Sequence, residues 1–61
     1  MGNLTKEEIH EMERMLHFES VLIKKYASLS NACTDPQIRA KFEQISARHQ
    51  DHLNRLLNYL E

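Results

Sequence analysis

Apolar residues recur at alternating steps of three and four in two stretches of the chain, on either side of a short polar break. In the first stretch this spacing links seven positions: Ile9, Met12, Leu16, Glu19, Ile23, Tyr26 and Ser30. In the second stretch it links seven more: Ile38, Phe42, Ile45, His49, His52, Leu56 and Tyr59. Such steps place side chains on the face of a helix that meets a partner helix. The pattern therefore predicts two helices, and we call each set of seven positions a seam.

Local signals define where the two helices begin and end. Thr5 is a favourable N-cap, and Glu8, three residues later, completes a capping box, so the first helix is expected over about 5–32. Pro36 disfavours helix in the residue before it and is well tolerated in the first turn of a helix. The second helix is therefore expected over about 36–60, capped by Asp35 or by Thr34 with Gln37.

The connection between these helices, at 33–35, is short enough to force them into an antiparallel hairpin. The sequence thus predicts an all-α fold with a single helical-hairpin domain over 1–61. Its apolar surface is wider than one seam, because further apolar residues flank it: Met15, Leu22, Leu29, Leu53 and Leu60. A stripe of this width is typical of bundle helices, and one hairpin covers only part of it. We therefore expect the chain to dimerise into a homodimeric four-helix bundle.

Three ionisable residues interrupt the apolar seams near their centres. With the turn centred near residue 34, Glu19 and His49 fall at one level, about 15 residues or roughly 22 Å from the turn. His52 lies one helical turn from His49 on the same face. A charge placed inside a protein is costly unless it is paired or bound to a metal. The sequence therefore predicts a polar layer of Glu19, His49 and His52.

Two interpretations of this layer are open. As a metal site, Glu19, His49 and His52 supply nitrogen and oxygen ligands that suit Fe, Zn, Mn, Ni or Co, and the ion could be redox-active. As a metal-free polar layer, the same residues would fix the register of the helices at some cost in stability.

Other residues that could carry chemistry have a simpler interpretation. Tyr26, Met12 and Met15 are expected to pack in the interior, and Cys33 is expected to be an unreactive thiol. His10 and His17 fall outside the seams and are expected to face solvent, with His17 a remote candidate for a supporting role near the layer.

Composition excludes several classes of function. The net charge of −1 gives no basic surface for nucleic acid. No apolar run is long enough to span a membrane, and no signal-peptide pattern is present, so a soluble intracellular protein is expected. A single cysteine excludes an internal disulfide. The chain has no hydrolase triad, phosphate-binding loop or zinc-finger spacing, so no enzymatic activity is predicted.

The order of several residues along the chain resembles the half-bundle of the ferritin-like superfamily: Glu19, Tyr26, Asp35-Pro36, Phe42, His52 and Leu56. The runs 24–27, 33–36 and 49–53 are similar, within that superfamily, to the short proteins of the spore coat F family. The resemblance implies a dimeric four-helix bundle in an endospore-forming bacterium. It also implies a location in the mother-cell cytoplasm or the spore coat, and coat proteins as partners beside a second copy of the chain.

The resemblance carries metal-ligand roles onto Glu19 and His52 only. His49 stands where di-metal members have the glutamate of a Glu-x-x-His motif, which normally bridges two ions. An imidazole rarely bridges metals, so a single-metal site or a metal-free layer is expected in its place. Two hypotheses follow: a small structural protein that assembles in the spore coat, and a metal-binding protein that uses Glu19, His49 and His52.

Overall fold

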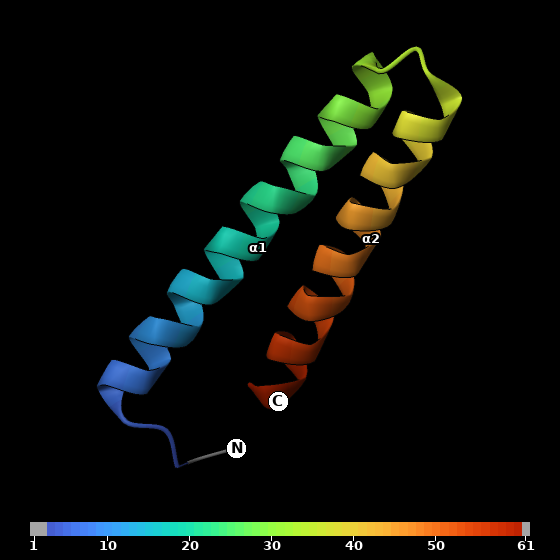
Figure 1. Ribbon diagram of the computed structural model, residues 1–61. Helices are drawn as coiled ribbons and strands as arrows, with labels where there is room; N and C mark the ends of the chain where they lie inside the picture. The colour runs from blue at the N-terminus through green and yellow to red at the C-terminus, as the bar shows by residue number, and fades with distance from the viewer. Residues whose placement is uncertain (1–2, 61) are drawn as a thin grey trace.

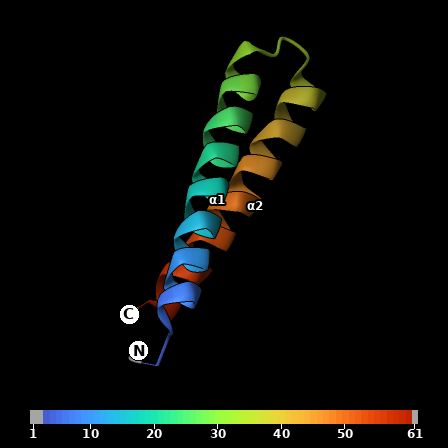
Figure 2. The same ribbon diagram turned by 90° about the vertical axis from the view of Figure 1, so that its left-hand side faces the viewer.

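The structure, a computed structural model, describes residues 3–60 and contains two helices. Helix α1 spans Lys6–Ala32 and helix α2 spans Pro36–Tyr59. They run antiparallel, side by side, and the turn at 33–35 joins them at one end of the molecule (Figure 1; Figure 2). The predicted all-α helical hairpin is therefore confirmed, and the pairing of two hairpins into a four-helix bundle stays a prediction.

The start of α1 is fixed by the predicted capping box. The Glu8 amide donates to Thr5 Oγ1 over 3.1 Å, and the Thr5 amide donates to Glu8 Oε1 over 2.9 Å. The bond from the Thr5 amide, with a smaller contribution from the Thr5 side chain, holds the pKa of the Glu8 carboxyl below its usual value. A lowered pKa means that the contribution of Glu8 to stability is present at neutral pH and is lost as the pH falls through that pKa.

The start of α2 is capped by Asp35. Its Oδ1 accepts from the amides of Gln37 and Ile38, at 2.8 and 3.2 Å. Pro36 follows in the first turn, where its missing N–H has no intrahelical partner to lose. Of the two predicted caps for α2, the structure therefore has Asp35 and not Thr34.

Polar contacts tie the two helices together in the half of the hairpin nearer the turn. Arg39 Nε donates to the Ser30 carbonyl over 3.1 Å, and Ser30 Oγ donates to Glu43 Oε1 over 3.2 Å. Ser46 Oγ donates to the Ile23 carbonyl over 3.1 Å. Because these bonds cross between helices at fixed levels, they help to set the register in which the side chains of α1 meet those of α2.

The hairpin buries little apolar surface by itself. Among residues 3–60 no hydrophobic side chain is fully buried, and the two buried residues, Glu19 and Ser30, are both polar. Some seam members are half-buried, but the outermost apolar ones are exposed: Ile9, Ile38 and Tyr59. The prediction that the whole seam lies inside is therefore wrong at its ends, because one neighbouring helix can cover only a narrow strip. Neither described helix is long and apolar enough to cross a membrane.

The cap of α2 offers a direct test of the hairpin. Asp35→Ala should lower the free energy of unfolding by about 1 kcal/mol, because two amides of the first turn lose their acceptor. Urea unfolding at one fixed protein concentration measures the change. Thr34→Ala is the matched control and should shift stability by less than about 0.5 kcal/mol. Equal losses in the two variants would contradict the assignment of Asp35 as the cap.

Candidate metal centre

Three side chains from the two helices meet at mid-height of the hairpin. Glu19 is the central residue of α1, with residues 6–18 before it and 20–32 after it. His49 and His52 lie one turn apart on α2, so both rings project toward the same stretch of the facing helix. The antiparallel packing places that stretch at Glu19. The register predicted from the turn position is therefore confirmed.

Each oxygen of the Glu19 carboxylate faces one imidazole. His49 Nδ1 lies 2.7 Å from Glu19 Oε1, a short hydrogen bond in which the ring nitrogen donates and the carboxylate accepts. His52 Nδ1 lies 3.3 Å from Glu19 Oε2. Charge-assisted contacts of this kind are stronger than neutral hydrogen bonds. The carboxylate thus holds both imidazoles by the same ring nitrogen.

The three side chains differ in how far solvent reaches them. The exposed fraction is 11% for the Glu19 side chain, 21% for His49 and 46% for His52. The carboxylate is therefore nearly enclosed, while the His52 ring is half in water. The cluster opens to solvent on the side of His52.

Two rings, those of Tyr26 and His52, pack against His49. The Tyr26 ring lies nearly parallel to it, with centroids 6.2 Å apart and an interplanar angle of 15°. Phe42 packs against Tyr26 at 6.0 Å, and the His52 ring stands edge-on to His49 at 5.6 Å. These distances are within the range of favourable aromatic pairs. The neighbours therefore restrict the orientation of the His49 ring.

The cluster is compact enough to hold a metal ion. One ligand atom from each of Glu19, His49 and His52 lies within 4.8 Å of the other two. Metal bonds of about 2.1 Å to nitrogen and oxygen allow two ligands of one ion to be at most about 4.2 Å apart. Small side-chain rotations would therefore bring all three donors onto one ion. Two imidazoles and a carboxylate suit Fe, Zn, Mn, Ni or Co, and they leave coordination positions for other ligands.

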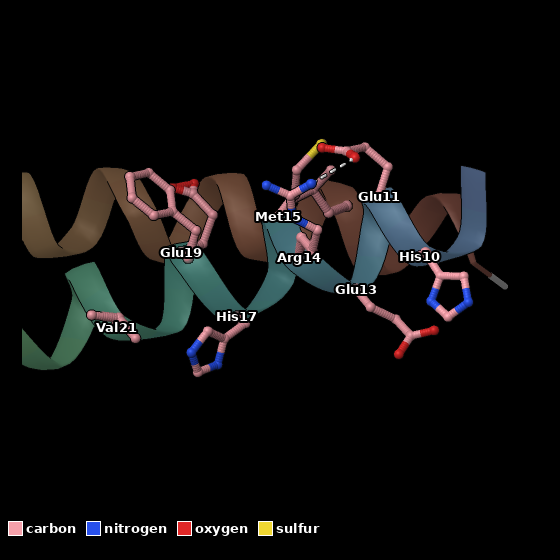
Figure 3. Close-up of a pocket in the computed structure, with 10 residues that line it drawn as sticks. His10, Glu11, Glu13, Arg14, Met15, His17, Glu19 and Val21 are labelled. Carbon is pink, nitrogen blue, oxygen red and sulfur yellow. Dashed lines mark hydrogen bonds and ion pairs between the residues drawn. The ribbon is translucent and has the colours of Figure 1, made fainter. Parts of the chain in front are cut away.

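The other candidate residues lie outside this cluster. His10 and His17 are exposed on α1 and point away from α2, as Figure 3 shows. Cys33 is half-buried at the turn, where its Sγ lies 3.5 Å from the Asp35 carbonyl. Met12 is half-buried as expected, whereas Met15 is 39% exposed, so the prediction of an interior Met15 is wrong for the single hairpin.

An open groove beside the cluster was not predicted from the sequence. It runs along α1, and its lining includes Met15, Phe18, Glu19 and Leu56 (Figure 3). Phe18 is 63% exposed although it is a large aromatic residue. Phe18 lies outside the seam, so counting seam positions passed over it. Its spacing of three from Met15 and four from Leu22 could have identified it as part of the apolar flank.

Comparisons of the chain with protein-family models, curated proteins and solved structures find no match. The resemblance to the spore coat F family therefore stays a prediction that depends on the residues quoted for it.

Because His49 is more enclosed than His52, replacing His49 should destabilise the metal-free protein more than replacing His52. His49→Leu should lower the free energy of unfolding by about 1–3 kcal/mol, because the nearly enclosed carboxylate loses its shorter contact. His52→Leu should cost less, since that ring is half-exposed and its contact is longer. Urea unfolding in the presence of EDTA measures both values.

The same experiment includes a compensated variant. Replacing Glu19, His49 and His52 together with Leu should restore or exceed wild-type stability, since no charge is then left without a partner. If the triple variant were the least stable of the set, the interpretation of Glu19 as a charge that needs partners would be wrong.

Proposed function

We propose that the protein binds one transition-metal ion per chain between α1 and α2, with Glu19, His49 and His52 as ligands. The observation that supports this most directly is the approach of both imidazoles to one nearly enclosed carboxylate, at 2.7 and 3.3 Å. These N···O distances are close to the spacing of adjacent ligands around one ion. A metal could therefore enter with little movement of the helices.

The composition of the cluster favours one ion over a pair. Among the described residues it holds one carboxylate and two imidazoles within reach of one another. Paired ions are usually joined by bridging carboxylates, and His49 stands where such a glutamate would be needed. The bound ion would act as a Lewis acid or, if it is iron or manganese, as a redox centre. The proposal itself extends only to binding.

We further propose that the working form is a homodimeric four-helix bundle with a structural role, for which the spore coat is the setting that the family resemblance suggests. The exposed apolar flank of α1 supports self-association, because Met15, Phe18 and Leu29 are 39%, 63% and 38% exposed. Grouped apolar residues of this kind usually mark an interaction surface.

Metal binding has a thermal signature. A metal that binds only the folded state stabilises it by about 2.7 kcal/mol at 100 times its Kd. For a chain of this length, that corresponds to a rise in Tm of about 10–20 °C. We expect Zn²⁺ or Fe²⁺ to produce this shift in the wild type and not in the variant His49→Leu/His52→Leu. Differential scanning calorimetry at constant protein concentration measures it.

The control removes the same number of imidazoles from elsewhere. His10→Gln/His17→Gln should keep the full shift, since both residues lie outside the cluster and glutamine keeps them polar where they line the groove beside it. Elemental analysis of untagged protein after metal loading should find about one ion per chain. Loss of the shift in the control variant, or protein that retains no metal, would rule out the site.

Dimerisation is tested by mass. Sedimentation equilibrium at micromolar concentration should give about twice the chain mass of 7.2 kDa. The reason is that no apolar side chain among the described residues is fully buried, so a single hairpin needs a partner surface to be stable. A folded monomer at that concentration, seen as full helicity together with single-chain mass, would overturn the proposed bundle.

A further inference from the structure

The amount of exposed surface indicates what covers the groove. The chain exposes 4922 Å², whereas a compact monomer of its mass of 7.2 kDa would expose about 4100 Å². The excess of about 800 Å² is close to what one partner buries in a protein–protein interface of standard size. The radius of gyration is 14.4 Å, against about 10.5 Å for a compact chain of 61 residues. The hairpin thus has the surface of one half of a larger assembly.

The groove is the part of this surface that borders the cluster. Met15, Phe18 and Leu56 give it an apolar lining, and Glu19 contributes to that lining from its central position on α1. Charged residues of both signs line it as well, and Arg14 Nη1 lies 3.4 Å from Glu11 Oε2 (Figure 3). Aromatic, Met and Arg side chains, which are all present in this lining, are enriched in protein–protein interfaces.

The position of Glu19 along α1 favours a second copy of the chain as the occupant. In a twofold dimer with both turns at the same end, each residue lies at the same height as its counterpart in the other copy. If the turns lie at opposite ends and the two hairpins overlap fully, the midpoints of the helices of both copies lie at the same height. Because Glu19 is the central residue of α1, both arrangements bring the two clusters to one level. A net charge of only −1 per chain also presents little repulsion to such pairing.

We infer that a second copy of the chain docks in this groove, against Glu19 of the metal site, so that metal binding and dimerisation strengthen each other. The inference rests on the proposed metal site. Docking would remove water from the groove beside Glu19, and drier surroundings strengthen the attraction between the ion and this charged ligand. In return, the ion would fix Glu19, the ligand that lines the groove, in one arrangement before the partner arrives, which lowers the ordering cost of association.

Coupling of this kind is reciprocal and has a measurable size. Allosteric couplings typically change affinity by about 5- to 150-fold, and the same factor applies to both ligands. We therefore expect saturating Zn²⁺ to lower the dimer dissociation constant of the full chain by at least about 10-fold relative to EDTA. Sedimentation equilibrium across a range of chain concentrations measures the dimer constant in both conditions.

A pair of exposed apolar residues supplies the test of the docking surface. Phe18→Glu places a charge in the groove and should weaken dimerisation by at least about 10-fold, as expected when a buried aromatic contact is lost. Leu57→Glu is the matched control, because Leu57 is 44% exposed and does not line the groove. It should dimerise as the wild type does.

A titration of the wild type tests the coupling without any variant. The affinity for Zn²⁺ should rise as the chain concentration passes through the dimer constant. Zn²⁺ bound at one ion per chain with an unchanged dimer constant would overturn the coupling and leave the metal site in place. If no Zn²⁺ bound at any chain concentration, the proposed metal site itself would be wrong. If Phe18→Glu dimerised like the wild type, the groove would not be the docking surface.

Discussion

The contact between the Glu19 carboxylate and the His49 ring, 2.7 Å long, lies where most helical hairpins have an apolar pair. Glu19 and Ser30 are the most enclosed residues of the part of the chain that the structure describes, and both are polar. A carboxylate at such a position must be matched by the facing helix, since an unmatched one is costly. A slip of α2 by one turn would separate His49 from Glu19. The polar contact therefore fixes the register of the two helices. Apolar side chains alone would specify it poorly, because one apolar side chain can replace another in the same contact.

Much of this arrangement follows from sequence, and the reasons are local. Thr5, Glu8 and Pro36 mark the starts of the helices through bonds within one turn, so they can be identified without tertiary information. The layer could be predicted because a short turn converts sequence distance into height along the hairpin. The exposure of Ile9, Ile38 and Tyr59 could not be predicted from the sequence, because the burial of a residue depends on how many helices pack around its own. Periodicity states which face is apolar, not what covers it.

The asymmetry of the cluster affects how an ion could reach it. His49 is held between Glu19 and the Tyr26 ring, whereas His52 is 46% exposed and makes the longer contact. A site with one fixed and one looser imidazole can admit an ion from the His52 side while Glu19 and His49 keep their positions. The cost of reorganisation then falls mainly on one side chain. This asymmetry is the physical reason to propose that the polar layer binds a metal and is not only a device for register.

The shortage of apolar core connects the proposed metal site to the proposed dimer. Chains of about this length rarely gain more than about 3–5 kcal/mol from a core of their own, and here no apolar side chain in 3–60 is fully buried. A charged layer at mid-height lowers that margin further unless something compensates it. A bound ion would satisfy the layer, and a partner surface would cover the apolar flank beside it. Because Glu19 belongs both to the cluster and to the groove lining, the two sources of stability act at the same place. Metal and partner are therefore expected to favour the same folded state.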